Sequence, residues 1–170
     1  MADPAFQIRP GADEDRLRLA GLFAAVAEER DGIATEPPVD VEARAASWTL
    51  DGTFVAVAGN DVIGSLHLER SRHGFGELGM AVAREWRGRG VGSGLLAAAI
   101  ESARESGLHK LSLSVFSHNA AAIALYGKVG FVEEGRRVKH YRRSSDELWD
   151  TIEMGLLLVS DTGAGTRAGA

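Results

Sequence analysis

The sequence predicts a mixed α/β fold, in which a partly parallel central sheet of about six to seven strands is flanked by about four helices. Two observations support this prediction. Short segments in which apolar and polar residues alternate are typical of strands, and longer segments with apolar residues three or four positions apart are typical of helices. In the middle of the chain the two kinds of segment alternate, and a helix between two strands usually joins them in parallel.

Glycine and proline residues separate the expected elements of the first half of the chain. Pro10 and Gly11 break the first strand, Asp13 is a plausible cap for the helix that follows, and 59–61 is a hairpin turn. The expected elements are strands at 6–9, 53–57, 62–68 and 76–82, a helix from about Leu17 to 31–32, a loop at 33–40 and a weaker helix at 41–50.

The second half contains the clearest helix, which we expect at 90–106 because its apolar residues have helical spacing and Gly107 is a good terminating residue. Asn119 is a candidate cap for a helix at 119–129, which is closed by Gly130. The remaining expected elements are strands at 110–115, 131–141 and 148–157.

Composition indicates one globular domain at 1–160, since 45% of the 170 residues are hydrophobic and 25% are charged. Residues 161–170 are rich in Gly, Ala and Thr, so we expect a flexible C-terminal tail. The chain contains no cysteine, which excludes disulfides, thiolate metal sites and a cysteine nucleophile. Its net charge of -5 argues against nucleic acid as a partner. No apolar run is long enough to span a membrane and no cysteine requires an oxidising compartment, so we expect a cytoplasmic protein.

A glycine-rich turn lies between the expected strand at 76–82 and the expected helix at 90–106. Gly88, Gly90 and Gly92 permit backbone conformations closed to other residues, and free N–H groups at a helix start bind anions. No Lys-Ser or Lys-Thr pair follows the last glycine, which excludes a Walker loop, and Leu95 stands where a dinucleotide fingerprint would need glycine. The turn instead has the pattern Arg-x-x-Gly-x-Gly, beginning at Arg87.

This pattern resembles the cofactor turn of the GNAT superfamily of N-acetyltransferases, and a second segment extends the resemblance. Residues 117–131 contain Asn119, a Leu-Tyr pair at 125–126 and a closing Gly-Phe, which is similar to the family's second signature. The resemblance covers about residues 6–158 and implies acetyl-coenzyme A (acetyl-CoA) as the cofactor. The residues that it implies for cofactor binding are Met80, Ala81, Val82, Arg87, Gly88, Arg89, Gly90, Val91, Gly92, Ser93, Asn119 and Tyr126.

The resemblance also suggests catalytic roles. A backbone N–H near Val82 would stabilise the oxyanion, and Tyr126 would protonate the departing thiolate, unless it is simply packed against the sheet. Asn119 would both cap its helix and bind the pantetheine arm. Glu77 is the first candidate for the general base, because it shares the small face of its strand with Gly79 and Ala81; the alternative is a solvent-facing glutamate.

Glu36 is the candidate substrate-binding residue, because the resemblance places the loop at 33–40 at the acceptor mouth. Four neighbouring acidic residues would give this mouth a charge that favours cationic amines, and the alternative is a solvated acidic loop; the four are Glu28, Glu29, Asp31 and Asp40. The five histidines show no metal-ligand spacing, so we expect no metal site. The arginine and lysine residues at 136–143 are expected to lie at a solvated strand edge, although phosphates or RNA are alternative contacts.

The sequence therefore predicts transfer of acetyl from acetyl-CoA to a primary amine of a small metabolite or amino acid, directly and in a ternary complex. Two alternatives stay open. One is acetylation of a protein or peptide N-terminus, and the other is a non-catalytic acyl-CoA-binding module. A homodimer is a further expectation, because the sheet is expected to have exposed edges.

Overall fold

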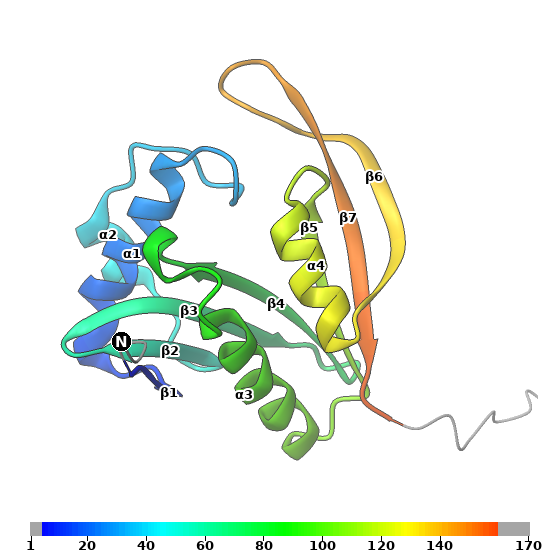
Figure 1. Cartoon of the computed structure of the whole chain (residues 1–170), viewed down its shortest axis with the longest axis horizontal. Coiled ribbons are helices and arrows are strands. Elements are labelled where there is room, and N and C mark those ends of the chain that lie inside the picture. Colours follow the sequence, from blue (N-terminus) through cyan, green and yellow to red (C-terminus); the bar gives the residue numbers. More distant parts are fainter. Residues whose placement is uncertain (1–4, 160–170) are drawn as a thin grey trace, which may run out of the picture.

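A computed structural model describes residues 5–159, and Figure 1 shows that its strands form one sheet. Within that range the sheet has seven strands in the order β1-β2-β3-β4-β5-β7-β6, and only β4 and β5 are paired in parallel. The predicted fold class is confirmed. The elements are β1 (Gln7–Pro10), η1 (Asp13–Asp15), α1 (Arg16–Glu28), α2 (Val41–Ser47), β2 (Thr53–Ala58), β3 (Asp61–Arg70), β4 (Phe75–Val82), η2 (Arg84–Trp86), α3 (Val91–Glu105), β5 (Lys110–Phe116), α4 (Ala120–Val129), β6 (Val132–Arg142) and β7 (Leu148–Leu157).

The first two helices are shorter than predicted, and the backbone explains why. Helix α1 ends at Glu28 rather than near 31–32, because Arg30 adopts a left-handed conformation with φ of 60°. Helix α2 ends at Ser47 rather than at 50, because Trp48 is already extended. The predicted tail at 161–170 lies outside the described residues.

The start of α1 is anchored by Asp15 rather than by the predicted cap, Asp13. The Asp15 carboxylate is buried and accepts hydrogen bonds from the Arg9 guanidinium at 2.6 and 2.9 Å and from the Ala12 N–H at 2.8 Å. The hydrogen bonds and charge of Arg9, with the Ala12 N–H, outweigh burial and lower the pKa of Asp15. This contact ties β1 to the first helix.

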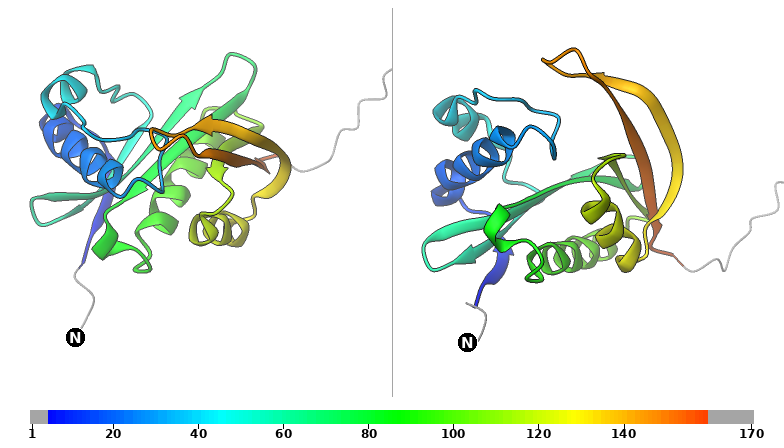
Figure 2. Two further views of the ribbon diagram at one scale, coloured as in Figure 1. Left: turned by 90° about the horizontal axis from the view of Figure 1, so that it is seen from above. Right: turned by 45° about the horizontal axis from the view of Figure 1, so that its top comes forward.

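The helices cover both faces of the sheet, with α1 and α2 on one face and α3 and α4 on the other (Figures 1 and 2). Alternation along the strands separates two apolar clusters. Leu19 and Val26 of α1 pack with Val55 of β2, while Leu95 of α3 belongs to the larger cluster on the opposite face. Gly64 of β3 permits α3 to approach closely, because a Cβ there would lie 2.8 Å from a methyl group of Val91.

Strands β4 and β5 separate before they end. Their parallel pairing runs only from Phe75 with Lys110 to Glu77 with Ser112, although β4 continues to Val82 and β5 to Phe116. On its other side β4 stays paired with β3 up to Val82. The diverging ends therefore leave one side of β4 without a hydrogen-bonding neighbour, and this opening is the centre of the candidate site.

Candidate active site

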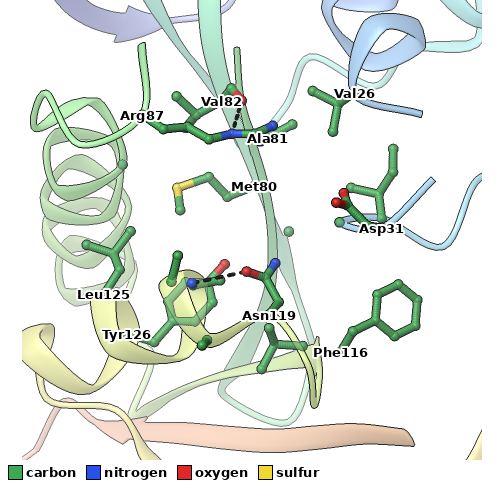
Figure 3. A pocket seen from close by; sticks show the side chains of 18 of the residues that line it. Val26, Asp31, Met80, Ala81, Val82, Arg87, Phe116, Asn119, Leu125 and Tyr126 are labelled. Carbon is green, nitrogen blue, oxygen red and sulfur yellow. Dashed lines mark hydrogen bonds between the residues drawn. The ribbon is translucent and has the colours of Figure 1, made fainter. Parts of the chain in front are cut away.

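A cavity of about 910 Å³ lies between the separated strands and reaches the start of α3. Figure 3 shows Met80, Ala81 and Val82 on one wall, with Asn119 and Tyr126 of the α4 region facing them. Residues 31–34, which follow α1, close the cavity on the opposite side from α3 and α4. The site therefore combines a strand gap, a helix start and a covering loop.

The turn before α3 presents a row of backbone N–H groups. Gly88 and Gly90 have φ of 73° and 84°, and Gly90 is the left-handed N-cap of α3, with no side chain to satisfy the helix start. Within residues 5–159 no acceptor is found for the N–H groups of residues 88–93; the first bonded amide of the helix is Gly94, which donates to the carbonyl of Gly90 at 3.0 Å. Six consecutive free amides at the positive end of a helix are an arrangement that commonly binds anions in proteins.

The Arg87 side chain is engaged within the protein. Its Nη1 and Nη2 donate to the two carboxylate oxygens of Glu29 at 2.7 and 2.9 Å, and its Nε donates to the Val82 carbonyl at 3.0 Å. Partial burial alone would raise the pKa of Glu29, but Arg87 and the nearby Arg84 outweigh burial and lower it. Arg87 therefore joins the end of α1 to the turn, and its guanidinium is not free for a phosphate in this arrangement.

The backbone of Val82 on β4 points into the gap between the strands. The Ala83 N–H donates to the Ile63 carbonyl, and the ladder pairs Ala81 with Ser65 and Val82 with Gly64. Because residues of an antiparallel ladder alternate between bonded and non-bonded pairs, the N–H and carbonyl of Val82 face away from β3. The Arg87 Nε donates to the Val82 carbonyl, which is possible because this carbonyl points away from β3. A free N–H at Val82 thus faces the cavity.

Tyr126 lies on α4 at the edge of the cavity, with its ring against Phe131 at 5.8 Å between centroids. The residue is only 6% exposed, and burial raises the pKa of its phenol to about 12. The hydroxyl therefore keeps its proton through the neutral range and is a hydrogen-bond donor directed at the site (Figure 3).

Asn119 caps α4, as the sequence predicts, with its Oδ1 accepting from the Ala122 N–H at 3.2 Å. It also lines the cavity, so its side-chain amide group stays available as a donor. Met80, Ala81, Val82, Arg87, Gly88, Gly90, Gly92, Ser93, Asn119 and Tyr126 are the predicted cofactor-binding residues that line the cavity.

Four predicted site residues do not line the cavity: Arg89, Val91, Glu77 and Glu36. The Val91 side chain is buried in the core, and the exposed Arg89 side chain stacks on Trp86 at 5.4 Å, although the backbone N–H groups of both residues belong to the free row at 88–93. Glu77 is exposed on the same face of β4 as Gly79, at the level where β4 and β5 are still paired, and it does not line the cavity. Its position gives no support to a role as the base.

Glu36 is bound to the tip of the hairpin between β6 and β7. Its carboxylate accepts from the Ser144 N–H at 2.9 Å and from the Ser144 hydroxyl at 2.7 Å. These bonds, together with the charge of Arg143, lower the pKa of Glu36. Glu36 thus holds the covering loop against the hairpin, and it does not line the cavity. Both of its oxygens are engaged, which leaves the predicted substrate contact without support here.

A carboxylate that sequence reasoning missed lies on β7. The Oε1 of Glu153 accepts hydrogen bonds from the hydroxyls of Ser114 at 2.9 Å and Thr151 at 3.3 Å, and lies 3.2 Å from the Nε of Arg137. Ser114 and Thr151 both line the cavity. Within the described residues Oε2 accepts no hydrogen bond. The alternation of β7 is the only sequence signal for this residue, because the sequence does not show that β7 lies beside β5.

No group of three or more His, Cys, Asp or Glu side chains among residues 5–159 is arranged to hold a metal ion. None of the described helices is long and apolar enough to cross a membrane.

Residues 13–131 match the Acetyltransferase (GNAT) family, and the chain belongs to this family of acetyl-CoA-dependent N-acetyltransferases. The mycothiol acetyltransferase of Paenarthrobacter aurescens is 35% identical over 132 residues, which are 72% of this chain and 40% of that protein. The L-amino acid N-acetyltransferase AaaT of Escherichia coli is 33% identical over 99 residues, or 55% of this chain and 60% of that protein. The chain thus spans less than two thirds of either relative.

Solved structures agree with the fold. The ribosomal-protein-alanine N-acetyltransferase of Brucella melitensis has a TM-score of 0.79 and 30% identity, covering 89% of this chain and 99% of that one. An acetyltransferase of Salmonella typhimurium solved with acetyl-CoA has a TM-score of 0.81, covers 97% of this chain and 99% of that one, and is 23% identical, which shows the fold alone.

Proposed function

We propose that this acetyltransferase moves acetyl from acetyl-CoA directly to the primary amine of a small metabolite or amino acid. The row of free amides at residues 88–93, which opens into a strand gap ending at Tyr126, is the observation that supports the proposal best. The donor supplies an acetyl thioester. The free amides would bind its diphosphate, and Asn119 would donate to its pantetheine arm.

The Val82 N–H would stabilise the negative charge that develops on the acyl oxygen as the amine adds to the carbonyl carbon. The new C–N bond then replaces the C–S bond. Tyr126 would supply a proton to the sulfur, because its buried phenol is neutral and borders the same cavity. Since the chain has no cysteine, it would carry no thioester intermediate of its own.

Glu153 is better placed than Glu77 to take the proton from the acceptor ammonium. Like Glu77, Glu153 does not itself line the cavity, but Ser114 and Thr151, which do, donate hydrogen bonds to its Oε1, and its Oε2 accepts no hydrogen bond among the described residues. Among the described residues the Glu77 carboxylate makes no hydrogen bond to a residue that lines the cavity. We therefore assign Glu153 the role of base, either directly or through the Ser114 hydroxyl.

Glu153→Gln should lower kcat by about 10²-fold or more, the typical contribution of a general base. Initial rates across pH, with saturating acetyl-CoA, would measure the effect. The matched variant Glu77→Gln makes the same neutral change on the same sheet face and should have a much smaller effect. A large loss of kcat in Glu77→Gln together with normal kcat in Glu153→Gln would show that Glu77, and not Glu153, is the general base.

The covering loop favours a small acceptor over a protein terminus. Hydrogen bonds from Ser144 to Glu36 and from Arg143 to the Ala34 carbonyl join residues 34–36 to the hairpin tip. An extended peptide lying between the loop and the hairpin would require the two to separate further than a small acceptor would. The homodimer and the cytoplasmic location stay predictions of the sequence.

Release of free coenzyme A thiol in the presence of a panel of primary amines tests the function. We expect acetyl-CoA-dependent release with small amines or amino acids, and mass spectrometry should find the acetyl group on the acceptor nitrogen. Tight acetyl-CoA binding without release on any amine would instead support a non-catalytic binding module. Activity confined to peptides would favour the protein N-terminal alternative.

A further inference from the structure

Arg143 at the tip of the β6–β7 hairpin is unlike the other basic residues at 136–143. Arg136, Arg137 and Arg142 are exposed and pair with carboxylates, as a solvated strand edge predicts. The Arg143 side chain is only 3% exposed. The sequence prediction of a solvated edge is therefore wrong at this residue.

Aromatic rings and a carbonyl hold the Arg143 guanidinium in place. Its central carbon lies 4.4 Å from the Trp149 ring and 5.5 Å from the Phe116 ring. Its Nη1 donates to the Ala34 carbonyl at 2.8 Å. Three contacts from three different segments thus fix the direction of the side chain.

One whole edge of this guanidinium has no hydrogen-bond partner among residues 5–159. Nε and Nη2, which together form the side-on fork of an arginine, are buried and unbonded. The nearest carboxylate oxygen is Oε1 of Glu36, at 3.8 Å from Nη2, and this oxygen already accepts from the Ser144 hydroxyl. Buried unpaired donors on a charged group are costly, so an acceptor for this edge would stabilise the protein.

The Arg143 side chain lies behind the wall of the active-site cavity. Ala34 and Phe116 both contact Arg143 and both line the cavity. Tyr141, whose ring packs edge-on against Phe116, lines it as well. Residues 34–36 lie beside the guanidinium, since the Ala34 carbonyl accepts from Nη1 and Oε1 of Glu36 is 3.8 Å from Nη2, and the exposed Ser144 holds Glu36 to the hairpin. Because the fork is buried in this arrangement, a ligand from the cavity reaches it only if a neighbouring segment such as 34–36 moves aside.

We propose that the Nε–Nη2 edge of Arg143 binds the carboxylate of the acceptor, so that the preferred acceptor is an amino acid rather than a simple amine. This inference rests on the proposed function. A planar carboxylate matches the two parallel N–H donors of the fork, and a guanidinium keeps its charge at every relevant pH. Arg143 is then a specificity-determining residue at the end of the cavity away from the phosphate-binding turn.

The test compares amino acids with their α-carboxamides, which keep the amine and lose the negative charge. For each of L-alanine, L-leucine, L-methionine and L-phenylalanine, kcat/KM is measured for the acid and for the amide with the wild-type protein and Arg143→Met. We expect Arg143→Met to lower kcat/KM about 10- to 100-fold for the acids through KM, and by less than about threefold for the amides. Taking the ratio of variant to wild type for each acceptor cancels differences in amine basicity.

Arg143→Lys keeps the charge without the fork and should lose most of the preference for acids. Arg142→Met removes an exposed arginine one residue away and should leave both classes unchanged. Equal losses for acids and amides in Arg143→Met and Arg143→Lys would overturn the proposal and assign Arg143 a structural role. So would equal wild-type activity on both classes. Failure of the wild-type protein to acetylate any amine would instead refute the proposed function, which separates the two results.

Discussion

Tyr126→Phe should lower kcat by about 10²- to 10⁴-fold, the usual contribution of a general acid. The substitution removes one oxygen and keeps the ring that packs against Phe131. Because the residue borders the cavity and no hydrogen bond from its hydroxyl is found within residues 5–159, loss of the oxygen should not destabilise the fold. Steady-state kinetics with saturating acetyl-CoA would measure kcat, and calorimetric titration would show that acetyl-CoA affinity changes by only a few-fold.

The raised pKa of Tyr126 gives this prediction a second measurement. A pKa of about 12 means that the phenol is protonated, and able to donate, at all lower pH values, and loses its proton only as the pH rises through that value. Ionisation of Tyr126 should therefore not reduce kcat up to about pH 10. Tyr141→Phe removes the other tyrosine hydroxyl and should cause a loss at least tenfold smaller. Full activity in Tyr126→Phe would show that another group protonates the thiolate.

The parts of the site that sequence predicted are those encoded locally. Glycine at 88 and 90 marks a turn that needs positive φ, and Asn119 before an apolar helix marks a cap. Both signals lie within a few residues of the structure that they determine. The strand gap follows less directly, since it depends on where the pairing of β4 and β5 ends.

The parts that sequence missed depend on contacts between distant segments. Glu153 meets Ser114 only because β7 inserts between β5 and β6, and nothing within β7 specifies that order. Arg143 belongs to a run of basic residues whose other arginines are exposed, and its burial depends on Trp149, Phe116 and a loop more than a hundred residues away in the chain. A run of basic residues usually lies at a solvated strand edge, so the local composition predicted that Arg143 would be exposed, and this prediction was wrong.

Contacts between distant segments also explain why Glu36 and Arg87 do not have the ligand contacts that the sequence predicted. Sequence predicted that each would face a ligand, yet each is bound by a residue far away in the chain. Glu36 is held by Ser144, and Arg87 is held by Glu29. The Arg87–Glu29 pair joins the end of α1 to the glycine-rich turn, and the Glu36–Ser144 pair joins the covering loop to the β6–β7 hairpin, so both charged residues hold parts of the site together.

Gly90→Val should reduce acetyl-CoA affinity by about 100-fold or more. Gly90 has φ of 84°, a conformation that a β-branched residue tolerates poorly, so valine would either strain the turn or rotate it. Rotation would misdirect the free amides of residues 88–93, and each hydrogen bond lost to a charged phosphate costs about 1.5–3 kcal/mol. Calorimetric titration with acetyl-CoA and with coenzyme A would measure the loss.

Gly107→Val is the matched control for this prediction. Gly107 lies just beyond the other end of α3 and has φ of 73°, and a Cβ added there, as at Gly90, would meet no atom within 4 Å outside its immediate neighbours. The two valine variants should therefore lose similar thermal stability, because each forces one residue into a left-handed conformation at a cost of about 1–2 kcal/mol. Only Gly90→Val should lose the cofactor, since the amides at the start of α3 are unaffected by strain at its far end. Equal loss of affinity in both variants would show that helix stability, and not the row of free amides, controls binding.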